Sequence, residues 1–215
     1  QAVLVDEYSR LHCGGTILNE YFILTTVQCA EHHKDLHVLV GVVDRDEEEP
    51  NRAIYRVDKI IIHDKYRPHS VDNDIALLKL KEPITFSEDV VPACLPEEDF
   101  AGNVLMNQTF GIVSGFGRSF ERSREAKRMK VLQIPYVDRE TCQLVYHNRV
   151  TENMFCGGHD KDGKGICQGD GGGPHVTLYK GTYFVTGITS WGGGKCLSRR
   201  QYGVYTKVVN FLPWV

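Results

Sequence analysis

Short stretches rich in valine, isoleucine, threonine and aromatic residues recur along the chain, separated by turn residues. Examples are LHVLVGVV at 36–43, YRVDKIIIH at 55–63 and YFVTGITSWG at 183–192. Runs of this length and spacing predict β-strands joined by turns rather than alternating strand–helix units. The sequence therefore predicts an all-β fold of the barrel or sandwich type. Helix is expected only as a short turn at 138–142 and another near 211–214.

The charges are nearly balanced, with 25 basic and 28 acidic residues and a formal net charge of −3. We therefore expect neither nucleic acid nor an anionic membrane as a general partner. The length of 215 residues favours one domain, or two half-domains that share a core. No apolar run of membrane-spanning length and no signal peptide is evident. Because the chain does not begin with methionine, we expect it to be the ordered or processed part of a longer precursor.

Seven cysteines are present, and none forms a C-x-x-C pair. Disulfide bonds are a better explanation for them than zinc, and disulfides indicate a secreted, extracellular protein. The sequon Asn107-Gln108-Thr109 predicts N-glycosylation at Asn107, which agrees with that location. The odd number leaves one cysteine, either as a free thiol or in a bridge to a segment outside this sequence.

A series of segments, in the same order along the chain, resembles the chymotrypsin-like (trypsin-type) serine proteases. They are CGGTILNEYFILTT, DNDIALLKL, PACLP, GIVSGFG, CQGDGGGP, GITSWG and YGVYTKV. VVPACLP, IPYVDR and GGPHVTLYKGTYFVTGI most resemble the heavy chains of coagulation factor X and of venom prothrombin activators. The resemblance covers essentially all of the chain and implies a single protease-like domain, with its activation segment preceding Gln1. That domain consists of two six-stranded antiparallel β-barrels with a boundary near 95–115, a short C-terminal helix and an active site between the barrels.

Proteases of this family use a serine nucleophile, a histidine base and a buried aspartate. By resemblance, Asp74 in VDNDIALLKL matches the aspartate, Gln28 in LTTVQC replaces the histidine, and Gly171 in GDGGGP replaces the serine. A glutamine amide does not exchange protons near neutral pH, and glycine has no side-chain nucleophile. The resemblance therefore predicts a catalytically inactive homologue.

The resemblance also assigns the residues around these positions. The backbone amides of Gly169 and Gly171 match the oxyanion hole. Gly165 stands where trypsin-like members have an aspartate, so the specificity pocket offers no counter-charge to a basic side chain. Asp170 matches the residue that pairs with the new N-terminal ammonium after zymogen cleavage. The other substrate-binding positions implied by the family are Gln168, Ser190, Trp191, Gly192 and Gly203.

Family pairing implies the disulfides Cys13–Cys29, Cys142–Cys156 and Cys167–Cys196. Cys94, in PACLP, is then the unpaired cysteine, and it matches the residue that tethers a light chain in factor X-like proteins. We therefore expect Cys94 to form an interchain bridge.

Two charged segments match loops with known roles in the family. The acidic segment at 44–49 matches a calcium loop, but Val42 and Arg52 stand at ligand positions. We expect no tight metal site and at most weak calcium binding near Asp44, Asp46 and Glu47. The basic segment at 118–130 matches the autolysis loop and is a candidate site for a cofactor protein or a heparin-like polyanion. Its basic residues are Arg122, Arg124, Lys127, Arg128 and Lys130.

The sequence thus predicts a secreted, non-catalytic protease homologue that acts by binding a cofactor, substrate or inhibitor of a coagulation-type cascade. Changes at Gln28, Gly165 and Gly171, within an otherwise retained scaffold, favour this interpretation. One alternative is an active serine endopeptidase whose triad residues were engineered or misread. Another is a structural domain of a larger secreted protein.

Overall fold

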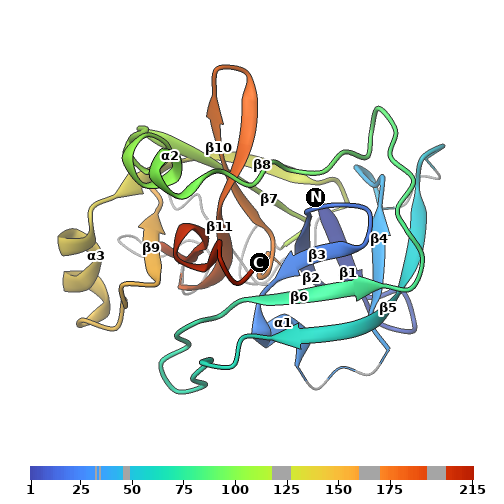
Figure 1. Cartoon of the computed structure of the whole chain (residues 1–215), viewed down its shortest axis with the longest axis horizontal. Helices are drawn as coiled ribbons and strands as arrows, with labels where there is room; N and C mark the ends of the chain where they lie inside the picture. Colours follow the sequence, from blue (N-terminus) through green and yellow to red (C-terminus); the bar gives the residue numbers. More distant parts are fainter. Residues whose placement is uncertain (32, 34, 46–48, 118–126, 160–169, 193–201) are drawn as a thin grey trace.

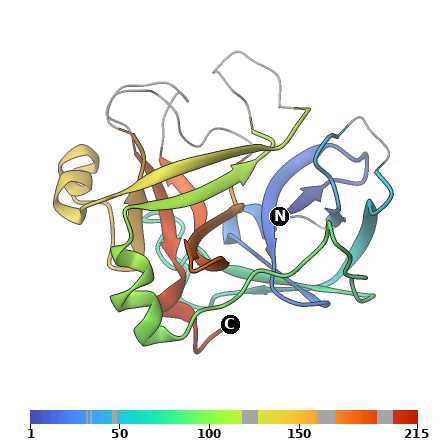
Figure 2. The same cartoon turned by 90° about the horizontal axis from the view of Figure 1, so that it is seen from above.

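The predicted strands close into two six-stranded antiparallel barrels that lie side by side (Figures 1 and 2). The structure is a computed structural model, and it describes residues 1–215 except 32, 34, 46–48, 118–126, 160–169 and 193–201. The predicted fold class is therefore confirmed.

The first barrel has the strand order β1-β2-β3-β6-β5-β4, and β1 pairs with both β2 and β4, which closes it. Its interior holds apolar side chains such as Leu4, Ile23, Val38 and Leu78, all fully buried. Its strands are β1 (Ala2–Val5), β2 (Leu11–Ile17), β3 (Phe22–Thr25), β4 (His37–Val40), β5 (Ala53–Ile62) and β6 (Ala76–Leu80).

The second barrel has the order β10-β11-β12-β9-β8-β7, and pairing of β10 with β7 closes it. Val113, Ile134, Phe155 and Tyr205 form one cluster of its core. Its strands are β7 (Phe110–Gly115), β8 (Lys130–Val137), β9 (Met154–Gly157), β10 (Pro174–Tyr179), β11 (Thr182–Gly192) and β12 (Gly203–Lys207).

The described helices are short: α1 (Val27–Ala30), α2 (Glu98–Asn103), α3 (Arg139–Tyr146) and the 3₁₀ turns η1 (Leu105–Asn107) and η2 (Val208–Phe211). The helical turn predicted at 138–142 is part of α3, where the side chain of Asp138 accepts a hydrogen bond from Thr141 N at 3.0 Å. The predicted C-terminal helix is the turn η2, which begins before residue 211 because Val208 and Phe211 are buried against the barrels. No described helix is both long and apolar enough to cross a membrane.

Apolar contacts join the two barrels. Leu24 and Ile75 of the first barrel region share one buried cluster with Val185 and Ile188 of β11 and with Val208. Burial of this cluster fixes the loops of one barrel against those of the other. Of the residues predicted to form the active site, Asp74 directly precedes Ile75 of this cluster, and Ser190 follows Ile188 by two residues.

Candidate active site

Asp74 lies just before β6 and has a relative exposure of 1%. Its Oδ1 accepts hydrogen bonds from the backbone amides of Val27 at 2.8 Å and Gln28 at 3.3 Å. Its Oδ2 accepts from Gln28 Nε2 at 2.9 Å and from Ser190 Oγ at 2.7 Å. Burial raises the pKa of Asp74, while the hydrogen bonds from Gln28, Ser190 and Val27 act to lower it. The carboxyl group thus ties together α1, the start of β6 and β11.

Gln28 lies in α1, where the capping side chain of Thr26 accepts a hydrogen bond from Cys29 N at 3.2 Å. The side-chain amide of Gln28 directs its nitrogen to Asp74 and also to the carbonyl oxygen of Ser190, at 3.4 Å. Gln28 is otherwise exposed. Because both amide hydrogens are directed at these oxygens, the Oε1 carbonyl of Gln28 is the group that remains for a ligand.

Gly171 lies beside α1, in the loop before β10. A Cβ atom added there would have Cys29 Sγ, at 3.9 Å, as its nearest contact, so the site has room for a side chain. The loop backbone is held across the two barrels, because Gly14 N donates to Gly171 O at 2.8 Å and Gly172 N donates to Thr189 O at 2.8 Å. Replacing Gly171 therefore requires no change in the shape of this loop.

Asp170 packs against the end of β7. Its Oδ1 accepts a hydrogen bond from Gly117 N at 2.9 Å. A Cβ atom on Gly117 would lie 2.5 Å from the carboxyl carbon of Asp170, and one on Gly115 would also overlap the carboxyl group. The carboxyl group of Asp170 can lie against the backbone at these two positions because glycine has no side chain. Its predicted pairing with a new N-terminus stays a prediction.

Ser190, Trp191 and Gly192 form the end of β11. On one edge β11 pairs with β12 as far as Gly192, opposite the buried Gly203. On the other edge the pairing with β10 ends at Ile188. Among the described residues, no strand pairs with this second edge beyond Ile188, although the backbone of Thr189 bonds to Gly172 and Gly173.

The chain was compared with models of known protein families. The family model described as Trypsin matches residues 1–215. The chain belongs to the trypsin family. In this trypsin-family domain, Asp74, Gln28 and Ser190 come from both barrels and are joined by hydrogen bonds. Gly171 lies close to Cys29, the residue after Gln28.

Two of the predicted disulfides, Cys13–Cys29 and Cys142–Cys156, are confirmed. Cys94 is an exposed free cysteine, and its carbonyl oxygen accepts a hydrogen bond from Val185 N at 2.8 Å. Asn107 is exposed at the end of η1, where its Nδ2 donates to Asn103 O at 2.8 Å, and its glycosylation stays a prediction. Several predicted residues lie outside the described part of the chain: Asp46, Glu47, Arg122, Arg124, Gly165, Cys167, Gln168, Gly169 and Cys196.

The acidic and basic segments meet, which the sequence did not indicate. Arg128 Nε lies 3.3 Å from Asp44 Oδ2, and their backbones form an isolated antiparallel bridge. Met129 N donates to Val43 O at 2.8 Å, and Glu49 Oε1 accepts from Asp44 N, also at 2.8 Å. Asp44 and Arg128 therefore partly neutralise each other. Lys127 and Lys130 flank Arg128, and within the described ranges no group of three or more metal-binding side chains is present.

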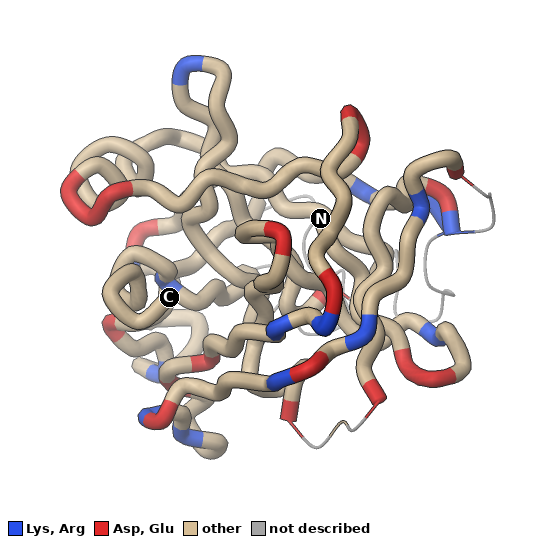
Figure 3. The backbone as a smooth tube through the Cα atoms, turned by 45° about the vertical axis from the view of Figure 1, so that its right-hand side comes forward, with Lys and Arg blue, Asp and Glu red and all other residues tan. Residues whose placement is uncertain are grey.

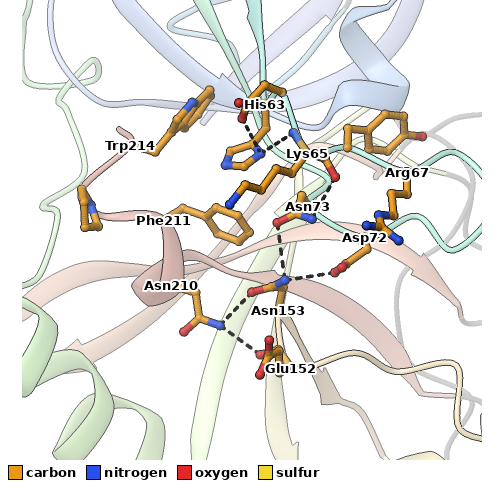
Figure 4. Close-up of a pocket in the computed structure, with 13 residues that line it drawn as sticks. His63, Lys65, Arg67, Asp72, Asn73, Glu152, Asn153, Asn210, Phe211 and Trp214 are labelled. Atoms are coloured by element: carbon orange, nitrogen blue, oxygen red, sulfur yellow. Dashed lines mark hydrogen bonds and ion pairs between the residues drawn. The ribbon is translucent and has the colours of Figure 1, made fainter.

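A groove of about 710 Å³ lies between the loop after β5, the turn before β9 and the C-terminal residues (Figure 4). A row of amides crosses its floor: Asn210 Nδ2 donates to Asn153 Oδ1 at 3.1 Å, and Asn153 Nδ2 donates to Asp72 Oδ1 at 3.1 Å. Asn73 Nδ2 continues the row by donating to Lys65 O at 3.0 Å. Because these polar groups bond to one another, the row is best explained as a joint between the barrels. The charged residues of all the described surface loops are mapped in Figure 3.

Proposed function

We propose that this trypsin-family domain is a non-catalytic homologue that binds an extended segment of another protein in the cleft between its barrels. The observation that carries the proposal is the hydrogen bond of 2.9 Å from Gln28 Nε2 to Asp74 Oδ2. It places a group that cannot shuttle protons against the buried carboxyl group at which the family's base would lie.

The chemistry of the site supports inactivity. Peptide cleavage by this family requires a nucleophile and a base that takes its proton. Gly171 offers no hydroxyl group, and Gln28 accepts no proton near neutral pH. Removal of triad residues from such enzymes leaves only about 10³- to 10⁴-fold acceleration over water, from the oxyanion hole and binding. That residual rate is too low for a functional protease.

The retained architecture supports binding. Beyond Ile188, the edge of β11 that faces away from β12 has no strand partner among the described residues, and such an edge accepts an extended peptide by strand addition. Gln28 adds a carbonyl oxygen that can accept a hydrogen bond from the bound segment. We propose that the partner is a cofactor, substrate or inhibitor of a coagulation-type protease cascade, and that the protein is secreted.

Cys94 supports the further proposal of a disulfide-linked light chain, since its thiol is exposed and unpaired. The factor X-like segments of the sequence favour the same arrangement. Weak calcium binding near Asp44 and polyanion binding near Lys127 and Lys130 are secondary proposals, and the pairing of Asp44 with Arg128 reduces the free charge available to both.

Labelling with a fluorophosphonate probe tests the proposed inactivity. We would compare the unmodified protein with the double variant Gln28→His/Gly171→Ser, which restores a base and a nucleophile where a side chain has room. The matched control is Gln28→His/Gly171→Ala, which has the same base but no hydroxyl group.

We expect labelling of the Ser-containing double variant alone, because the cleft and Asp74 are already in position. Labelling of the unmodified protein would show that another nucleophile is active and would overturn the proposal. If no variant is labelled, inactivity stands but the cleft has lost the geometry needed to hold a substrate, and binding must be assigned to another surface.

A further inference from the structure

The turn after α3 places an arginine beside the ring of Trp191, near the end of β11. α3 ends at Tyr146, and the next two residues, His147 and Asn148, have positive φ angles of 51° and 60°. These left-handed residues reverse the chain, so that Arg149 N donates to Tyr146 O at 3.2 Å. The guanidinium carbon of Arg149 then lies 5.6 Å from the centre of the Trp191 ring.

Tyr146 also contacts Trp191. Its ring meets the Trp191 ring edge-on, with centroids 4.8 Å apart, and its hydroxyl group donates to Tyr202 O. The indole of Trp191 therefore contacts both an aromatic ring that is itself hydrogen-bonded and a cation. An Arg–Trp pair of this geometry is attractive through the ring quadrupole.

Arg149 is a cation with no acidic partner in the described structure. Its Nε donates to Tyr146 O at 3.3 Å. Of the carboxylates in the described ranges, none forms an ion pair with it. The side chain is exposed, so the outer nitrogens of the guanidinium group can be reached by a ligand.

We propose that Arg149 is a specificity-determining residue that selects an acidic side chain in a segment bound along Ser190–Gly192. This inference rests on the proposed binding function of the cleft. In a segment paired with that edge, the residue opposite Trp191 projects its side chain to the same face of the sheet as the indole, and therefore toward the guanidinium group of Arg149.

The chemistry of Arg149 favours a carboxylate at this point. Nε is used in the bond to Tyr146 O, and the N–H groups of the two outer nitrogens remain to donate to a ligand. Two parallel N–H groups match the two oxygens of an aspartate or glutamate. A basic side chain would meet a like charge, and an apolar side chain would find part of the indole face already covered.

Binding of synthetic peptides tests the proposal. The chain has two tryptophans, so the variant Trp214→Phe leaves Trp191 as the sole indole, and its fluorescence reports occupancy at the edge. The probes are N-acetylated, C-amidated hexapeptides from a positional-scanning library, each made as a Glu and a Gln form at one position.

We expect the Glu form at one position to bind about fivefold more tightly than the Gln form, as is typical of a partly exposed charge pair. The preference should weaken as salt is raised. The charge reversal Arg149→Glu should remove the preference for Glu and favour Lys at that position. The matched control is Lys180→Glu, because Lys180 is also an exposed cation stacked on an aromatic ring, 5.5 Å from the centre of Tyr179, at the opposite end of β11.

The outcomes separate the two proposals. Peptides that bind with no difference between Glu and Gln, or whose preference survives in Arg149→Glu, would overturn the role of Arg149 and leave cleft binding intact. If no peptide in the library changes the fluorescence of Trp191, cleft binding itself is wrong, and the selectivity of Arg149 is overturned with it. Loss of the preference in Lys180→Glu would show a general effect of net charge and would also refute the assignment.

Discussion

His175 should make the stability of this domain depend on pH. The side chain is fully buried in the second barrel, with ring centroids 4.8 Å from both Phe155 and Tyr205. Nδ1 lies 2.7 Å from Thr186 Oγ1, while Nε2 is buried without a hydrogen-bond partner. Burial in these surroundings lowers the pKa of His175 to about 3.

The sign of the effect follows from where the proton binds. Below a pH of about 6.5 the unfolded chain protonates this histidine, whereas the folded chain does not until about pH 3. Protonation therefore lowers the free energy of the unfolded state relative to the folded state as the pH falls, so the free energy of unfolding declines between about pH 6.5 and pH 3. One proton corresponds to about 1.4 kcal/mol per pH unit, so the loss between pH 7 and pH 5 is about 2 kcal/mol.

Guanidinium unfolding under oxidising conditions at several pH values measures this loss. The variant His175→Leu keeps a side chain of similar size, and Thr186 Oγ1 retains partners in Thr177 and the backbone of residue 175. We expect the free energy of unfolding of the variant to fall by about 2 kcal/mol less than that of the wild type between pH 7 and pH 5. The exposed His69→Leu is the control and should keep the wild-type dependence. Equal pH dependence in the wild type and His175→Leu would refute the reasoning.

Two other predictions concern substitutions at Gln28 and at two glycines. Gln28→Glu places a second carboxyl group beside the buried Asp74, which raises the pKa of the pair. Denaturant unfolding should therefore show that the variant loses about 1–3 kcal/mol of stability as pH rises from 5 to 8. An equal loss of stability in the neutral variant Gln28→Met would contradict the prediction. Gly172→Ala should cost more than 2 kcal/mol, roughly, because φ is +79° and the new Cβ would lie 2.5 Å from Gly14 O. Gly181→Ala, at φ +81° in open space, should cost only about 1 kcal/mol. Thermal melts in which Gly181→Ala is the less stable of the two variants would show that the overlap with Gly14 O is relieved in Gly172→Ala.

The features that sequence predicts well here are local. The valine- and isoleucine-rich runs predicted strands because each is rich in β-branched or aromatic residues and is bounded by its own turn residues. In β4 the burial also alternates along HVLV. The start of α3 was predicted from Asp138, which does cap the helix. The pairings Cys13–Cys29 and Cys142–Cys156 came from the family resemblance, and sequence separations of 16 and 14 residues alone do not exclude other pairings.

Contacts between distant segments could not be predicted in this way. The bridge from Asp44 to Arg128 joins residues from different barrels, and in the sequence the two appeared only as separate charged loops. The position of Arg149 over Trp191 depends on two left-handed residues after α3, and no periodic pattern signals them. A histidine or asparagine in the sequence is compatible with a left-handed turn but does not require one.

The network around Asp74 explains why glutamine is a suitable replacement at position 28. A buried carboxyl group with fewer donors would cost stability, because each lost hydrogen bond leaves part of the charge unsatisfied. Gln28 supplies an N–H to Oδ2 in the place where an imidazole would supply one, and Ser190 supplies the second donor. The glutamine therefore keeps the buried acid hydrogen-bonded and the two barrels in contact, and on the proposed function it does so without the proton-transfer chemistry of a base. Replacement of the base by an apolar residue would have removed the chemistry and also weakened the cleft, so the identity of the substitution itself favours a cleft that is retained for binding.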